Sequence, residues 1–499
     1  MKLKKILAVI MSASMMVSAA AVSAYAADRV DYTINSTYAN VDWDNWNQYK
    51  ADLHTHSTAS DGSLTKTETV EAHYKYGFDI MALTDHGTVD AGWDTTSANR
   101  IIRIGKQLGD GKTLDPLESS GTTADGRQYT YANDYYTQFN SDGTADRSMM
   151  RVPNGNEQNP TSFNNAHVNT YFADFGDDSV GGTSNYEHPI KAADKLGGLS
   201  VINHPGEYSG ARNEQYEEDA YDISNAKYNY IVNKFANLLE KYDSCLGIDI
   251  NSKGDVRTRN DRKLWDLLLQ KVVPTGRNVY ATATSDAHNE AIINSGYTMM
   301  LMPEQTTTTL KSCMENGEFY AESRYLGNKS EIGDWAEILK KAGVGEELAA
   351  DFTELYATIC EEENAGKQRT VYEFDADATA PRITNIKVND VDDTIAISTK
   401  DAYLVRWIAD GEMIAVGNEI DLDNYSDQIG SYVRAEVIGE GGVIYTQAFT
   451  LEYDGAPEAE KDCFIDLGTP ASLICDSLVY ILAFVLKATG IVSLIYLFV

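Results

Sequence analysis

The stretch ADLHTHSTASDG, residues 51–62, places two histidines one residue apart and an aspartate five positions after the second. Residues i and i+2 of a β-strand point to the same face, so His54 and His56 can aim at one point if a strand ends here. Neutral imidazole is the commonest metal ligand, which makes a metal site one interpretation of this stretch. A His-x-His pair on a solvent-facing strand is the alternative, and the remainder of the chain has to decide between them.

The N-terminus has the organisation of a secretory signal peptide. The basic segment MKLKK is followed by the apolar segment ILAVIMSASMMVSAAAVSAYA, which ends in the small-residue pattern AYA. We therefore predict a signal peptide over residues 1–26 and an exported, extracellular or cell-surface protein. A membrane-spanning anchor is the less favoured alternative.

Composition narrows the choice of partners. The chain has 499 residues and a formal net charge of −34, and loss of residues 1–26 removes three lysines and no acidic residue. Because phosphate backbones repel so acidic a protein, no nucleic-acid partner is expected. The five cysteines are scattered and odd in number, so they form neither a disulfide framework nor a zinc-knuckle spacing.

Residues 27–326 alternate between apolar runs and helical patterns, which is typical of a parallel β/α sheet or barrel. The apolar runs YGFDIMALTDHG, GGLSVINHPG, DSCLGIDINS and VYATATSDAHN resemble buried strands that end in polar residues. The segments SLTKTETVEAHYKYG, NAKYNYIVNKFANLLEKY and RNDRKLWDLLLQKV are predicted helices. Residues 111–150 are rich in Gly, Ser, Thr, Asp and Tyr and are predicted to be a long polar surface insertion.

The pattern changes after Gly327. Residues 327–366 are acidic and helical, and residues 367–455 contain short alternating runs that predict a small β-sandwich-like domain. Residues 456–470 are interpreted as a linker, and residues 471–499 as a hydrophobic C-terminal segment.

Each predicted strand ends at a histidine or a carboxylate. In parallel barrels these ends converge on the face where active sites lie. Five of the eight histidines stand at such ends, and a sixth precedes an apolar and aromatic run: His54, His56, His86, His204, His288 and His167. Because so many histidines lie at strand ends, a shared metal cluster is favoured over separate histidines buried in the core. We expect His73 at the surface, His188 as a helix cap, and Asp85 either to orient a ligand or to cap its turn.

The motifs DLHTHSTASDG, MALTDHGT, INHPG and TSDAH resemble the successive motifs of the polymerase and histidinol phosphatase (PHP) domain family. The resemblance covers roughly residues 50–325. It implies a distorted seven-stranded β/α barrel with up to three metals, followed here by the small all-β domain, which bears a weaker resemblance to the C-terminal domain of some secreted members. The family's Gly-Ile-Glu turn is absent after TDH, so the bridging glutamate is expected at Glu157, with Glu118 as its rival.

The resemblance implies nine ligands for three metals. The first site is expected to hold His54, His56 and Asp286, the second Glu157, His167 and His204, and the third Asp61, His86 and His288. Mixed shells of imidazole and carboxylate suit two or three divalent transition metals and do not choose among zinc, manganese and iron.

Such a site predicts hydrolysis of a phosphate ester by a metal-bound hydroxide, because closely spaced metals activate water and bind a phosphoryl group. His54, His56, Asp286 and His288 are the predicted catalytic residues. Lys253, Arg257 and Arg259 are the predicted contacts for a small phosphorylated substrate, with a solvated basic loop as the alternative. An amidohydrolase-like metal hydrolase and a non-catalytic cell-surface protein that binds metal or ligand remain open.

The C-terminal segment Leu473–Val499 is long enough to span a bilayer, which requires about 20 apolar residues. It contains Asp476 and a central lysine, Lys487, and no basic residue follows it. We expect a single-span anchor, with a buried hydrophobic helix or a membrane-surface hairpin as alternatives.

Overall fold

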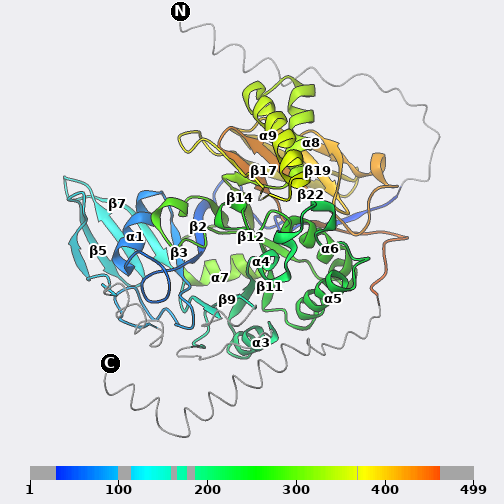
Figure 1. Cartoon of the computed structure of the whole chain (residues 1–499). Helices are drawn as coiled ribbons and strands as arrows, with labels where there is room; N and C mark the ends of the chain where they lie inside the picture. Colours follow the sequence, from blue (N-terminus) through cyan, green and yellow to red (C-terminus); the bar gives the residue numbers. More distant parts are fainter. Residues whose placement is uncertain (1–29, 99–113, 159–165, 177–185, 368, 461–499) are drawn as a thin grey trace, which may run out of the picture.

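The computed structural model describes residues 30–98, 114–158, 166–176, 186–367 and 369–460. The predicted signal peptide and hydrophobic C-terminal segment lie outside these residues. Strands and helices alternate through the first part of the described chain, and β-strands dominate the last part (Figure 1). The prediction of a mixed α/β protein is therefore confirmed.

The first motif lies at the end of a nine-residue strand whose last five residues are buried. Strand β2 (Asn47–Thr55) pairs in parallel with β3 (Ile80–Leu83), and β3 pairs in parallel with β7 (Ala145–Arg151). A second sheet has the order β12-β11-β10-β9-β8, in which β10, β11 and β12 are parallel. Its strands are β8 (Asn156–Gln158), β9 (Val168–Tyr171), β10 (Leu199–Ile202), β11 (Cys245–Asn251) and β12 (Tyr280–Ala283).

Two isolated bridges connect these sheets near the ends of their strands. Thr55 pairs with Ala287 after β12, and His86 after β3 pairs with Glu157 of β8. The described strands form no single closed ladder, so the seven-stranded barrel remains an interpretation. The bridges nevertheless bring the polar strand ends of both sheets to one place.

Helices flank the strands and begin at side chains that cap them. Helix α1 (Lys66–Lys75) begins with a capping box between Thr65 and Glu68, and α5 (Ala226–Lys241) begins at Asn225, whose side chain accepts a backbone N–H bond. The three predicted helices correspond to α1, α5 and α6 (Asp261–Val272). Shorter helices complete this part: α3 (Glu187–Lys195), α4 (Pro205–Ser209) and α7 (Thr307–Asn316).

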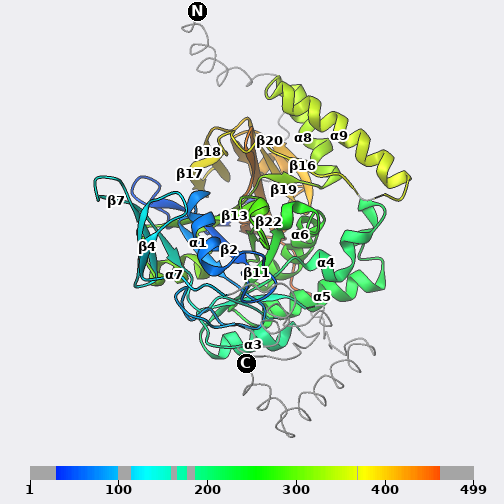
Figure 2. The same cartoon turned by 60° about the vertical axis from the view of Figure 1, so that its left-hand side comes forward.

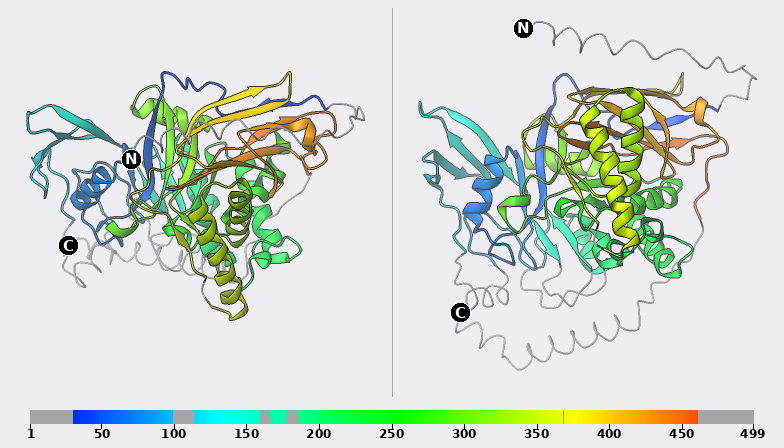
Figure 3. Two further views of the ribbon diagram at one scale, coloured as in Figure 1. Left: turned by 90° about the horizontal axis from the view of Figure 1, so that it is seen from above. Right: turned by 45° about the horizontal axis from the view of Figure 1, so that its top comes forward.

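The segment predicted as a polar insertion contains an antiparallel meander. Its strands are β4 (Ser120–Thr122), β5 (Gln128–Ala132), β6 (Tyr135–Phe139) and β7. The β5–β6 turn has Asn133 and Asp134 at φ 51° and 68°, as a two-residue hairpin turn of type I′ requires. The meander projects from one side of the molecule (Figure 3) and packs on α1 through Tyr74 and Tyr136.

The C-terminal strands pack as two sheets. One contains β17 (Arg382–Asn389), β18 (Thr394–Lys400) and β21 (Glu419–Asp421). The other contains β19 (Leu404–Ala409), β20 (Glu412–Val416), β22 (Tyr432–Gly439), β23 (Gly442–Tyr445) and β24 (Phe449–Glu452). Buried residues of both sheets, among them Ile397 and Val437, share one core cluster. We call residues 382–452 the β-domain.

The β-domain is joined to the first part of the described chain by a continuous ladder. Strand β23 pairs with β14 (Phe319–Ser323), β14 with β13 (Gly296–Met302), and β13 with β2. Helices α8 (Lys329–Ala342) and α9 (Glu346–Asn364) lie beside the β-domain strands (Figure 2). Strand β1 (Thr33–Asn35) pairs antiparallel with β24. Within the described residues, no helix is both long and apolar enough to cross a membrane.

Candidate metal centre

The site begins at the end of β2, where His54 and His56 are both buried. Their Nε2 atoms lie 3.2 Å apart. The predicted convergence of these two imidazoles on one point is therefore seen directly.

Glu157 lies at the centre of the cluster. Its Oε2 is 3.2 Å from Nε2 of His54 and of His56 and 3.3 Å from Nδ1 of His86. Its Oε1 is 2.8 Å from Nδ1 of His167 and 3.3 Å from Nε2 of His204. One carboxylate thus faces five histidines, as the predicted bridging role requires.

The backbone explains how an insertion can precede this glutamate without displacing it. The N–H of Glu157 donates to Thr84 O over 3.1 Å, and its carbonyl accepts the N–H of Gly87 over 3.1 Å, so β8 lies against the end of β3. A Cβ on Gly155 would collide with the carbonyl of Leu83, so this close approach requires glycine. The rival, Glu118, is exposed.

Asp286 contributes the second buried carboxylate. It follows β12 and has φ 45°, in the left-handed region. Its Oδ1 is 3.2 Å from His56 Nε2 and 3.5 Å from His54 Nε2, and its Oδ2 is 3.4 Å from His204 Nε2. Asp286 therefore faces three of the five histidines that Glu157 faces, from another strand end.

A more open group lies beside these residues. Asp61 Oδ2 is 3.2 Å from His288 Nε2 and 3.7 Å from His86 Nε2, and Asp61 Oδ1 is 3.6 Å from His56 Nδ1. The Asp61 side chain is 47% exposed, whereas Glu157 and Asp286 are almost fully buried. This edge of the cluster is the one that solvent can reach.

All nine predicted ligands are brought together. Four overlapping groups each have ligand atoms within 4.8 Å of one another: His56, Asp61, His86 and His288; His54, His56 and Asp286; His54, Glu157 and His204; and His86, Glu157 and His167. The structure groups His54, rather than His167, with Glu157 and His204, so the division into three sites differs in this detail. The individual ligand roles stay predictions.

The donor set fits divalent metal ions. Both ring nitrogens of His204, Nδ1 of His86 and Oδ1 of Asp286 are buried and have no hydrogen bond among the described residues. Buried polar atoms without a partner are costly, and a cation among them would satisfy them. Imidazole nitrogen with carboxylate oxygen is a donor set that transition metals accept.

Burial and neighbouring charges shift the pKa values of both the histidines and the carboxylates in the cluster. Burial lowers the pKa of His86 to about 4, and burial also lowers the pKa of His204, which favours the neutral imidazole that binds metal. Burial opposes ionisation of Glu157 and Asp286, but the surrounding histidines, with Lys253 for Asp286, outweigh it and hold both pKa values well below the ordinary range. Burial lowers the pKa of His56, but the carboxylates of Asp286 and Glu157 that face it outweigh burial and raise that pKa.

Hydrogen bonds behind the ligands fix their orientation. Asp85 accepts bonds from Ser57 N, Ser57 Oγ and Ser60 Oγ over 2.8, 2.7 and 2.7 Å, and Ser60 Oγ lies 3.3 Å from His56 Nδ1. Of the two roles considered for Asp85, orientation of a ligand through Ser60 is the one that this geometry favours. Asn203 donates to Glu157 Oε1 over 2.9 Å; it stands beside His204 in the INHPG motif and was not singled out.

The structure places two of the three predicted substrate contacts near the cluster and the third away from it. Lys253 Nζ lies 2.8 Å from Asp286 Oδ2, beside the cluster. Arg257 pairs with Glu207, whose Oε2 is 3.6 Å from His204 Nδ1, so it lies near the margin of the site. Arg259 is 5% exposed and donates to the carbonyls of Arg212 and Val256, so the structure does not bring it to the cluster.

Tyr208, which the sequence pattern did not indicate, stacks on His167 with ring centroids 4.2 Å apart.

Expectations for two other histidines were wrong. His73 is fully buried: its Nε2 is 3.0 Å from Asp52 Oδ2 and its Nδ1 is 2.8 Å from Thr69 O. It lies on the face of α1 that packs on β2, so its partner is a carboxylate of the neighbouring strand rather than water. His188 is exposed within α3, which begins after Tyr186, so it does not cap that helix.

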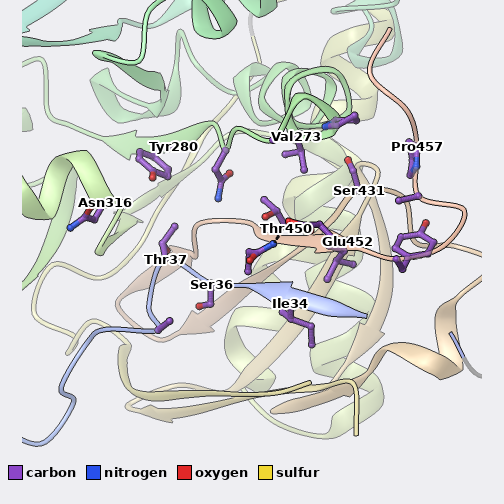
Figure 4. A pocket seen from close by; sticks show the side chains of 18 residues that line it. Ile34, Ser36, Thr37, Val273, Tyr280, Asn316, Ser431, Thr450, Glu452 and Pro457 are labelled. Atoms are coloured by element: carbon purple, nitrogen blue, oxygen red, sulfur yellow. Dashed lines mark hydrogen bonds between the residues drawn. The ribbon is translucent and has the colours of Figure 1, made fainter. Parts of the chain in front are cut away.

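A separate cavity of about 780 Å³ lies between β1, β24 and the start of β12 (Figure 4). Tyr280, at the first residue of β12, lines it, whereas Asp286 follows the other end of that strand. None of the nine predicted ligands lines this cavity. The candidate metal cluster and this cavity therefore lie toward opposite ends of β12.

No family model matches the chain. A curated relative, a 5′-3′ exoribonuclease of Haemophilus influenzae, is 56% identical over 40 residues, which are 8% of this chain and 15% of the exoribonuclease. The chain thus spans a small part of that relative's length.

Similar solved structures include a two-domain protein of Bacteroides vulgatus that contains a predicted PHP-like metal-dependent phosphoesterase. It is 14% identical with a TM-score of 0.35, over 82% of this chain and 88% of that one. Endonuclease Q of Pyrococcus furiosus is 12% identical with a TM-score of 0.28, over 54% and 56% of the chains. An amidohydrolase of Chromobacterium violaceum is 15% identical with a TM-score of 0.26, over 48% and 87%.

Proposed function

We propose that this chain is a metal-dependent hydrolase of the PHP type that cleaves phosphate esters. The observation that carries the proposal is the convergence of six histidines and three carboxylates from distant segments into one cluster with a lysine beside it. Amine and guanidinium groups are the protein's usual contacts for phosphoryl oxygens. Lys253 and Arg257 therefore favour a phosphoester over an uncharged amide substrate.

Divalent metals held here would supply a water of lowered pKa and a counter-charge for the phosphoryl oxygens. Glu157 and Asp286 each face histidines of more than one group, so they would keep neighbouring ions close together. The exposed side, formed by Asp61 and His288, admits the substrate, and Lys253 contacts its oxygens. His54, His56, Asp286 and His288 hold the reacting centre in this proposal.

The number of ions proposed is two or three, from zinc, manganese and iron. Three ions correspond to the pairing of each carboxylate with its nearest imidazoles, and Asp61, as the most exposed of the carboxylates, would hold the weakest. The supporting scaffold proposed is a distorted barrel of β2, β3 and β8 to β12, because the bridges Thr55–Ala287 and His86–Glu157 connect its two halves.

The substrate proposed is a small phosphorylated molecule, because a net charge of −34 opposes binding of a nucleic-acid backbone. A short RNA is included among the test substrates, because the matched curated relative is named an exoribonuclease. We further propose that the protein is exported and is attached to the membrane by residues 471–499. Cell fractionation tests the attachment: full-length protein released by high salt would contradict it.

The experiment is turnover on phosphate monoesters, phosphate diesters, a short RNA and an amide panel, with the purified protein before and after chelation. We expect at least one transition metal per chain by elemental analysis, phosphoester hydrolysis that a chelator abolishes, and recovery on metal addition. Hydrolysis of the amide panel alone would favour the amidohydrolase alternative. Bound metal without turnover of any substrate would favour a binding protein.

A further inference from the structure

The turn that follows β11 has a strained backbone. Lys253, Gly254 and Asp255 have φ angles of 49°, 62° and 58°, in the left-handed region that residues other than glycine rarely adopt. Such a conformation persists only where surrounding contacts hold it. Because Lys253 begins this turn, those contacts determine where its ammonium group points.

Asp255 provides the contacts. It is fully buried, and its two oxygens accept bonds from Arg262 NH1 and NH2, each over 2.8 Å. The same carboxylate accepts the N–H of Gly327 over 2.7 Å and the hydroxyl of Thr258 over 3.0 Å. Four donors from three residues thus hold one side chain of the turn.

Arg262 connects the turn to the β-domain. Its Nε donates to Glu331 Oε1 of α8 over 2.7 Å, and the hydroxyl of Tyr445 on β23 donates to Glu331 Oε2 over 3.3 Å. One helical turn further along α6, Asp266 accepts two bonds from Arg434 of β22, each over 2.8 Å. The β-domain therefore holds the helix that carries Arg262 at two points.

We propose that Asp255, fixed by Arg262, is a positioning residue that holds Lys253 at the metal cluster as the contact for the phosphoryl oxygens of the substrate. The β-domain keeps this arrangement rigid through Glu331 and Tyr445. This inference rests on the proposed phosphoesterase function and adds to it a role for the β-domain.

The test compares Lys253→Met, Asp255→Asn and the double variant in the metal-loaded full chain. The readouts are KM for p-nitrophenyl phosphate and the Kd of inorganic phosphate by calorimetry. Loss of one charge-assisted contact is expected to raise both by roughly tenfold to hundredfold. The double variant is expected to match Lys253→Met, since Asp255 acts only through that lysine. Metal content is expected to stay at the wild-type level.

Glu363→Gln is the matched control. Glu363 is 3% exposed and pairs with Lys329 and Arg369 over 2.7 and 3.0 Å, in a buried ion cluster that does not include the turn. It is expected to lower stability without changing KM or Kd. If Asp255→Asn does not fold, Thr258→Val removes a single donor to Asp255 and is expected to raise the same constants by a smaller factor.

The outcomes separate the two proposals. A wild type that hydrolyses no phosphoester but binds phosphate more tightly than Asp255→Asn overturns the proposed function alone. Equal phosphate affinity in the wild type and both turn variants overturns the positioning role. Fully additive effects in the double variant overturn it as well, because Asp255 would then act independently of Lys253.

Discussion

The hydrogen bonds behind His56 allow a quantitative test of the metal centre with the substitution Asp85→Asn. Asp85 is 3% exposed and accepts three bonds from Ser57 and Ser60, and Ser60 Oγ lies 3.3 Å from His56 Nδ1. Asparagine has nearly the same shape, so the change removes charge and one acceptor without leaving a cavity. The effect should therefore fall on the orientation of His56.

The magnitude follows from these contacts. Ser57 N and Ser60 Oγ both donate to Oδ1, which asparagine retains as a neutral acceptor. Each bond then loses its charge assistance, which is about 1 kcal/mol, so the free energy of unfolding should fall by about 1–3 kcal/mol. Loss of a partner behind a metal ligand typically weakens metal affinity about 10–100-fold, equivalent to about 1.4–2.8 kcal/mol.

The assay is competition for zinc or manganese against a chelating dye, with urea unfolding of the chelated protein measured in parallel. Asp266→Asn is the matched control: Asp266 is 4% exposed and accepts three bonds, all from Tyr432 and Arg434, neither of which is a predicted ligand. It should destabilise the fold and leave metal affinity unchanged. Metal affinity of Asp85→Asn within twofold of wild type, despite a measurable loss of stability, would refute the orienting role.

Three further predictions concern the ligands, the approach of β8, and a buried acid. His54→Ala and Asp286→Ala should abolish hydrolysis while circular dichroism stays native; near-normal turnover at saturating metal in either variant would contradict the assignment. Gly155→Ala should push β8 away from Leu83 and lower the metal content measured by elemental analysis, whereas Gly126→Ala, at a turn glycine with open space around its Cβ position, should not. Burial raises the pKa of Glu322 to about 7, so its contribution to stability is full below about pH 4.5 and is lost as pH rises to about 7. At pH 8 the free energy of unfolding of Glu322→Gln should therefore exceed that of the wild type by about 1–3 kcal/mol, which thermal unfolding would show as a higher melting temperature. Near pH 5 the two proteins should be equally stable. A constant difference in stability across this pH range would refute the account.

Local patterns sufficed to predict which side chains gather in one cluster, because each motif lies at the end of its own strand. His54 and His56 follow from the period of a strand, and Asp286 and His288 follow from a polar strand end. Glu157 followed from the resemblance together with its place between a strand and His167. The close packing of Gly155 on Leu83 explains why the intervening segment does not move it.

Contacts between distant segments could not be predicted in this way. Nothing near His73 in the sequence shows that Asp52 lies beside it, since the two meet only when α1 packs on β2. Arg259 was expected at the site because of its charge and neighbourhood, but the turn directs its side chain toward Arg212. The pairing of β14 with β23, which joins two predicted domains into one ladder, also depends on edges whose partners no local pattern specifies.

The pairing of β1 with β24 has a consequence for the order of folding. Asn35 lies opposite Thr450, so β1 receives its partner strand only after the more than 400 residues between them have been synthesised. Contacts of such high sequence separation form late and slowly. The same neighbourhood brings the two ends of the described chain together, which is the geometry that circular permutation exploits. In such a permutant a short linker would join the chain ends near β1 and β24, and the new termini would lie in the β5–β6 turn. Strands β1 and β24 would then be close in sequence, so the permutant should refold faster with the residues of the cluster still in place.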